Sequence, residues 1–162
     1  MSEEIFHIQP WTPKVREAAE RLMGHIHELA PELEVLFMGA AALGLPGKND
    51  IDLDVLCSKA DLKTYIEKLS PLFGKPKSVD DISAGWSFDF DGFEADVMIS
   101  DPTASHVRWQ RKRFEILKGN QELLAAYKKL KEASDGLPYA EYEQRKRTFR
   151  RESIFTQHII WF

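Results

Sequence analysis

Residues 50–57 read Asp-Ile-Asp-Leu-Asp-Val-Leu-Cys, and their alternation of acidic and apolar side chains decides the fold class. A period of two predicts a β-strand with one buried face, so Asp50, Asp52 and Asp54 should all point away from the core. Aspartate is a poor strand former, and like charges on one face repel. Such a strand therefore indicates either a bound cation or a fully solvated face, and the strand alone does not separate the two.

A further carboxylate is expected beside this strand. Asp91-Gly92 separates two alternating runs, which predicts a hairpin, and Asp96 on its second strand should face opposite to Ala95 and Val97. A hard cation such as Mg²⁺ or Mn²⁺ takes carboxylate oxygens and substrate phosphates as ligands. Either pair, Asp52 with Asp54 or Asp50 with Asp52, can share a metal that Asp96 completes.

The segment before the acidic strand is suited to phosphate. Residues 39–49 contain three glycines and a proline, and glycine lets backbone N–H groups approach an anion closely. Lys48 adds a mobile positive charge beside the acidic face. Gly39, Ala40 and Lys48 are therefore candidate phosphate contacts, and they favour a metal site over a solvated sheet face.

The rest of the chain indicates an α+β fold: a mixed sheet flanked by helices, followed by a helical C-terminal part. We expect one domain over 1–162, with an α/β core in 1–100 and a helical extension in 101–162 packed on it. Pattern and capping signals predict strands at 33–38, 50–57, 86–90 and 93–99, and helices at 13–29, 104–118, 121–133 and 139–160, with a further helix after Ser58.

Composition and charge limit the function classes. The single cysteine, Cys57, excludes an internal disulfide and a cysteine-based zinc cluster. The acidic start and the lack of a long apolar stretch predict a cytoplasmic protein without a membrane span. Residues 1–100 carry a net charge of −9 and residues 101–162 a net charge of +5. That division suits a carboxylate–metal centre facing a phosphate-binding surface, although solvated basic helices explain it equally simply.

The sequence also resembles a known family. Met38-Gly39-Ala40 followed by acid–apolar–acid–apolar is similar to the polymerase-beta nucleotidyltransferase signature, and residues 44–55, Gly-Leu-Pro-Gly-Lys-Asn-Asp-Ile-Asp-Leu-Asp-Val, resemble the GrpB (UPF0157) family. Further matches extend the resemblance over roughly residues 33–152. They comprise Asn120-Gln121-Glu122, Tyr127 with residues 128–131, and Tyr142, Lys146 and Phe149.

The resemblance implies a nucleotidyltransferase fold with metal on Asp52 and Asp54. The ungapped match through Lys48 favours this pair, while the general signature fits Asp50 and Asp52 as well. It also implies that Lys131 and Lys146 contact phosphates. Two departures stand out: Ala40 occupies the position of the family serine, and Glu94-Ala95-Asp96 replaces a His-apolar-His pattern.

These observations lead to one favoured function and several alternatives. The favoured function is Mg²⁺-dependent transfer of a nucleotidyl group from a nucleoside triphosphate to an unknown acceptor, with Asp52, Asp54 and Asp96 as the catalytic carboxylates. The alternative, motivated by Ala40, is a catalytically silent nucleotide- or phosphate-binding module that acts through a partner. RNA is a less favoured partner, because the basic helices are expected to pair with nearby glutamates. A third reading is self-association through the apolar residues 159–162; the oligomeric state is not predicted.

Overall fold

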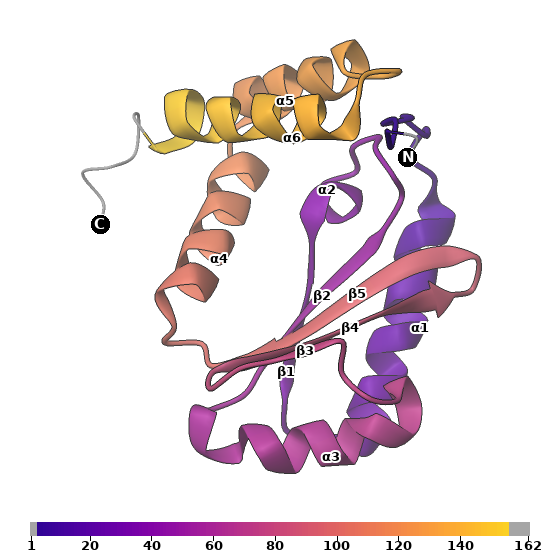
Figure 1. Ribbon diagram of the computed structural model, residues 1–162, viewed down its shortest axis with the longest axis vertical. Helices are drawn as coiled ribbons and strands as arrows, with labels where there is room; N and C mark the ends of the chain where they lie inside the picture. Colours follow the sequence, from indigo (N-terminus) through magenta and orange to yellow (C-terminus); the bar gives the residue numbers. More distant parts are fainter. Residues whose placement is uncertain (1–2, 156–162) are drawn as a thin grey trace.

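A computed structural model describes residues 3–155 and confirms the α+β class, with a mixed sheet flanked by helices (Figure 1). The sheet has five strands in the order β1-β2-β5-β4-β3. In chain order the elements are α1 (Pro13–Leu29), β1 (Glu34–Met38), α2 (Gly39–Ala42), β2 (Ile51–Leu56), a 3₁₀ turn (Lys59–Asp61), α3 (Leu62–Phe73), β3 (Ser78–Val79), β4 (Ser83–Phe90), β5 (Phe93–Ser100), α4 (Ser105–Lys118), α5 (Gln121–Ala133), α6 (Tyr139–Phe149) and a π-helical segment (Arg150–Phe155).

The central pair of strands is the parallel one. β2 runs parallel to β5, whereas β1 pairs antiparallel with β2, and β4 pairs antiparallel with β5 and with β3. Ile51, Leu53 and Val55 of β2 are buried in one apolar core with residues of α1 and α3, as the alternation predicts. The acidic residues of β2 consequently lie on the opposite face of the sheet.

The hairpin between β4 and β5 is confirmed. Asp91 and Gly92 have φ angles of 51° and 85°, the left-handed values that a tight two-residue hairpin requires. In the resulting register Ser87 is opposite Asp96, and Asp89 is opposite Glu94. The hairpin therefore brings β5 alongside β2 with its own polar residues on the acidic face.

The C-terminal helices lie over that acidic face. Figure 1 shows α4 beside the strands, with α5 and α6 crossing its far end. A second apolar cluster joins Leu45, which follows α2, to Leu117, Leu123, Tyr127 and Ile154. The single helix expected over 139–160 is instead α6 continued by the π-helical segment to Phe155, and residues 156–162, with the apolar stretch 159–162, lie outside the described residues.

Two features were missed by sequence reasoning. β3 is only two residues long, which is too short for a periodic signal. Residues 4–10 run beside the α5–α6 turn and form isolated bridges with Pro138 and Gly47. Helices long and apolar enough to span a bilayer do not occur within residues 3–155.

Candidate active site

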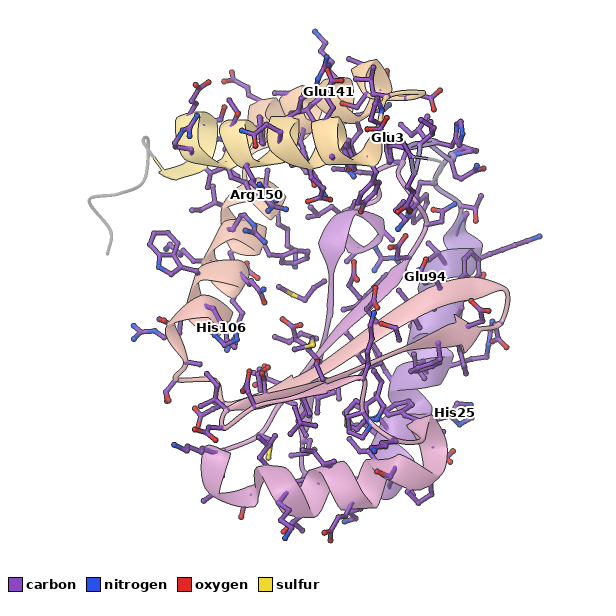
Figure 2. All side chains as sticks on the ribbon, viewed as in Figure 1. Glu3, His25, Glu94, His106, Glu141 and Arg150 are labelled. Carbon is purple, nitrogen blue, oxygen red and sulfur yellow. The ribbon has the colours of Figure 1, made fainter. Side chains whose placement is uncertain are left out.

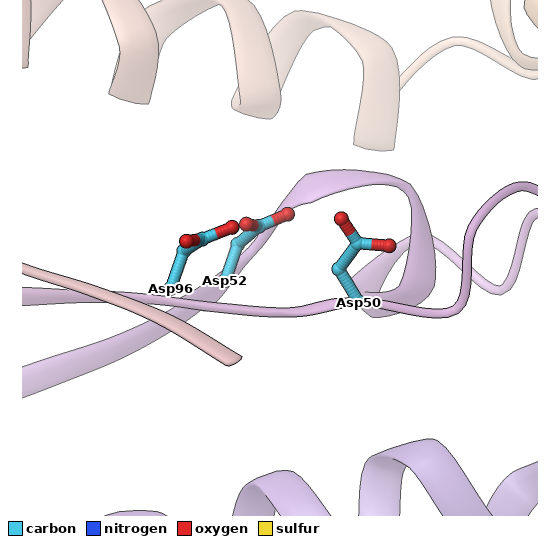
Figure 3. Close-up of side chains that lie close together, drawn as sticks. All are labelled: Asp50, Asp52 and Asp96. Atoms are coloured by element: carbon cyan, nitrogen blue, oxygen red, sulfur yellow. The ribbon is translucent and has the colours of Figure 1, made fainter. Parts of the chain in front are cut away.

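Three carboxylates meet at the start of the parallel strand pair. Asp52 is in register with Asp96 across β2 and β5, and Asp50 immediately precedes β2. One oxygen from each of these three residues lies within 4.8 Å of the others (Figure 3). The close-up shows all three side chains rising from the same side of the strands. The group thus draws on both strands, as the sequence predicted for Asp96.

Asp54 lies outside this group. It shares the face of Asp52 but sits one pleat further along β2, in register with Met98 rather than with a carboxylate. It still lines the same cavity. The structure therefore brings together Asp50, Asp52 and Asp96, which is the alternative register, and leaves Asp54 apart; the assignment of metal ligands stays a prediction.

Gly39 closely borders the carboxylate of Asp52. Its φ is +80°, which favours glycine, and a Cβ at this position would overlap Oδ2 of Asp52. On the other strand, the Ser87 hydroxyl donates a hydrogen bond of 2.5 Å to Oδ1 of Asp96. Both neighbours limit how these two carboxylates can rotate, so the oxygens are held where they converge.

The crowding of negative charge has an electrostatic cost. Burial above all, and then the charges of Asp50, Asp96 and Asp54, raise the pKa of Asp52 to about 7, against the opposing charge of Lys146. Burial is also the main cause that raises the pKa of Asp50. A bound cation would reverse both effects, because it favours the ionised carboxylates. Three oxygen donors converging from two strands fit a hard divalent ion such as Mg²⁺ or Mn²⁺.

A cavity of about 340 Å³ lies between the acidic sheet face and the C-terminal helices. That volume is at the lower end of the range usual for small-molecule sites. The predicted phosphate contacts Gly39, Ala40 and Lys48 line it, and so do Lys131 of α5 and Lys146 of α6. Each predicted site residue therefore borders one cavity, with acids on the sheet side and most of the bases on the helix side.

Lys131 is the most enclosed base of the helical side. Its side chain is only 4% exposed, and its ammonium group donates a 2.6 Å hydrogen bond to the hydroxyl of Tyr142. The same group lies 4.9 Å from the ring centre of Tyr127. Burial and the charge of Lys146 lower the pKa of Lys131 to about 8, while Asp50 and Asp52 counteract that shift.

The other two predicted lysines are held by glutamates. Lys146 forms a 2.7 Å ion pair with Glu143, and its ammonium group lies 4.5 Å from the ring centre of Tyr142. Burial lowers the pKa of Lys146 although Glu143 opposes the shift. Lys48 lies 4.0 Å from Glu94 at the edge of the acidic group. An incoming polyanion would compete with these glutamates for the lysines.

Tyr142, which the family resemblance offered as a candidate beside Lys131 and Lys146, lines the cavity, whereas sequence reasoning missed two arginines and two tyrosines of the cavity as site residues: Arg113, Arg150, Tyr127 and Tyr139. The arginines had been interpreted as solvated helix surface, yet burial and the charge of Arg150 lower the pKa of Arg113 to about 10. Figure 2 shows Arg150 between the end of α6 and α4. A signal did exist for Tyr127, of the same kind as for Tyr142. Tyr127 precedes Lys131 by four residues and Tyr142 precedes Lys146 by four, so each pair shares a helix face.

Comparisons with known proteins agree with the fold. No family model and no curated protein matches the sequence. Two solved structures of Cid1 poly(U) polymerase, one bound to MgGTP and one to Mg 3′-dATP, superpose with TM-scores of 0.51 and 0.52. They are 22% and 21% identical in sequence over 75% and 76% of this chain.

A likeness at that identity establishes the fold alone, and this fold is nucleotidyltransferase-like, as predicted. The chain spans only 41% and 40% of the two polymerase chains, so it corresponds to part of their length. Membership of the GrpB family stays a prediction.

Proposed function

We propose that this protein is a cytoplasmic, metal-dependent nucleotidyltransferase that transfers a nucleotidyl group from a nucleoside triphosphate to an unknown acceptor. The observation that carries the proposal is the convergence of Asp50, Asp52 and Asp96 on the floor of a cavity with a cationic opposite wall. In this assignment the three carboxylates hold Mg²⁺ or Mn²⁺. The metal would supply charge neutralisation at the transferring phosphorus.

The protein's own residues have distinct roles in this proposal. Gly39 allows the Asp52 carboxylate to lie against the backbone, because any side chain would occupy that space. Lys131 and Lys146 face the floor from α5 and α6 and bind the phosphates that lie over the carboxylates. Asp96, whose Oδ1 accepts a hydrogen bond from Ser87, also helps to take a proton from the acceptor group.

The test compares three single substitutions of aspartate by asparagine. Calorimetry measures Mn²⁺ binding, and then MgATP binding, to wild type, Asp50→Asn, Asp52→Asn and Asp89→Asn. Asp89 is a matched control, because it lies on the same sheet face, in register with Glu94, and is exposed. We expect at least about a hundredfold loss of Mn²⁺ affinity for the first two variants and wild-type affinity for Asp89→Asn. Equal affinity in all four proteins would refute the metal site.

A catalytically silent binding module is the second candidate, and Ala40 favours it. Ala40 lines the cavity at the position of the family serine, and its methyl group cannot donate a hydrogen bond to a phosphate. Labelled triphosphates screened against candidate acceptors separate the two functions. Transfer of label that depends on Asp50 and Asp52 excludes the silent module, whereas MgATP binding without transfer to any acceptor, even in Ala40→Ser, supports it.

A further inference from the structure

The N-terminal segment contacts both sides of the cavity. Figure 1 places it beside the α5–α6 turn and the loop that follows α2. At the C-terminal end of the segment, the backbones of Gln9 and Gly47 exchange hydrogen bonds of 2.7 and 3.1 Å. Asn49, directly before Asp50, donates its side-chain N–H to the carbonyl of Pro10 at 2.9 Å. This end of the segment is therefore attached to the loop that leads into the acidic strand.

The N-terminal end of the segment is attached to the helical side of the cavity. The backbone N–H of Phe6 donates a 2.9 Å hydrogen bond to the carbonyl of Leu137. Its carbonyl accepts a 2.8 Å hydrogen bond from the N–H of Gly136. The N–H of Tyr139 donates to the carbonyl of Glu4 at 2.7 Å. Within residues 3–155, these three are the backbone hydrogen bonds that join residues 3–100 to the part of the chain after Ala104. The segment thus complements the apolar cluster around Leu45 in joining the two sides.

Phe6 links this attachment to the cationic wall. Its ring is 1% exposed and stacks on the ring of Tyr142, with centroids 3.8 Å apart and an angle of 14° between the planes. The hydroxyl of Tyr142 accepts the hydrogen bond from Lys131, and its ring also lies near Lys146. One aromatic side chain therefore transmits the position of Phe6 to two lysines of the cavity.

We propose that residues 4–10 act as a brace that sets the helical wall over the acidic floor, with Phe6 as a positioning residue for Tyr142 and Lys131. The inference rests on the proposed function only in calling that wall phosphate-binding. The Phe6 ring does not line the cavity but stacks on Tyr142, so the effect of the ring passes through Tyr142. Loosening the stack frees the Tyr142 ring, which uncovers Lys131 and removes its fixed hydrogen bond, while the attachment at Gly47 and Asn49 keeps the carboxylates in place.

The test uses Phe6→Leu, which keeps an apolar side chain of similar bulk but loses the flat ring. Phe73→Leu is the matched control, because Phe73 packs against Trp86 and Phe88 on the other side of the sheet. The first measurement is the rate of Lys131 acetylation at fixed pH, by mass spectrometry, relative to the exposed Lys63 in the same molecule. The others are the affinities for Mn²⁺ alone and for MgATP, by calorimetry.

We expect Phe6→Leu to raise the relative acetylation of Lys131 about three- to tenfold, the scale of one lost aromatic stack. MgATP affinity should fall by a similar factor, and Mn²⁺ affinity should stay at the wild-type value. Phe73→Leu should change none of the three. A folded Phe6→Leu protein with unchanged Lys131 acetylation would overturn the brace, as would an equal rise in Phe73→Leu.

Two further outcomes are decisive. If wild type binds no MgATP, the proposed function fails, but the acetylation ratio still decides whether Phe6 positions Lys131. If Phe6→Leu does not fold, Asp135→Ala replaces it: this exposed carboxylate accepts a 3.0 Å hydrogen bond from the N–H of Ile8, so its loss loosens the brace without a cavity in the core. A smaller rise in Lys131 acetylation then supports the inference, and no change overturns it.

Discussion

The two faces of β2 differ in charge and in surroundings, although their residues alternate along one strand. Ile51, Leu53 and Val55 lie in a dry core under α1 and α3, where they are at most 1% exposed. Asp52 and Asp54 point into a cavity, where burial raises the pKa of both carboxyls. The apolar face stabilises the fold, whereas the acidic face costs stability in the absence of a cation. One strand thus encodes stability and chemistry at alternate positions, and the two should be separable by mutation.

The largest expected effect is on the apolar face. Leu53→Ala removes a fully buried side chain from the centre of the sheet and should lower the free energy of unfolding by about 3–5 kcal/mol. Urea denaturation measures this loss. The folded fraction should bind Mn²⁺ with wild-type affinity, since the carboxylates lie on the other face. A comparable loss of Mn²⁺ affinity in the folded fraction would show that the two faces are not separable.

The acidic face should respond to pH with the opposite sign from an ordinary ion-paired carboxylate. The folded-state pKa of Asp52 is about 7, above an unfolded value of about 3.9, so the folded state holds this proton more tightly. The contribution of Asp52 to the free energy of unfolding is therefore fully present below about pH 4. It is lost, by roughly 2–4 kcal/mol, as the pH rises to about 7. Asp50, whose pKa is also raised, adds a contribution of the same sign.

Urea denaturation in the presence of a chelator, from pH 4.5 to pH 8, measures this dependence. The slope of the unfolding free energy against pH should flatten in Asp52→Asn. It should persist in Asp89→Asn, because Asp89 lies on the same sheet face but outside the cavity. Saturating Mg²⁺ should remove the wild-type slope, because the cation favours the ionised form. A metal-free protein that becomes more stable between pH 4.5 and pH 7 would contradict the electrostatic description of the site.

Gly39 affects both the stability of the fold and the position of the Asp52 carboxylate. Its substitution should therefore have an intermediate effect on the free energy of unfolding. Gly39→Ala places a Cβ in a left-handed backbone conformation and against the Asp52 carboxylate, so we expect a loss of about 1–3 kcal/mol in unfolding free energy. Gly44→Ala is the matched control. It has a similar φ of 74° but open space around its Cβ, so it should lose stability without losing Mn²⁺ affinity. Equal Mn²⁺ affinities in both variants would mean that contact with Asp52 is unimportant.

The sequence was informative where the determinants are local. Alternation predicted both faces of β2, Asp91-Gly92 predicted the hairpin, and pattern and capping signals predicted the bounds of α1. Contacts between distant segments gave no such signal. Phe6 meets Tyr142 only because the α5–α6 turn folds back onto the N-terminus, and no periodicity reports that encounter. The cationic wall depends in the same way on how α5 and α6 pack.

The choice between the two aspartate pairs shows most clearly what the sequence alone does not predict. A period of two makes Asp50 with Asp52 and Asp52 with Asp54 equivalent along the strand. What separates them is the placement of the side chains: Asp50, just before β2, brings an oxygen within 4.8 Å of Asp52 and Asp96, whereas Asp54 is in register with Met98. That register depends on how two distant strands pair, so it became visible only in the folded structure.

The smallest expected effect therefore falls on Asp54. Asp54→Asn should weaken Mn²⁺ binding by less than about threefold, the size of a charge lost at a distance rather than of a lost ligand, while Asp50→Asn costs at least about a hundredfold. Calorimetry of the two variants in one buffer makes the comparison, with Asp89→Asn as the baseline. Both substitutions make the same chemical change two residues away from Asp52, so the comparison tests which of its two acidic neighbours is the metal ligand. The reverse order of effects would return the site to Asp52 and Asp54.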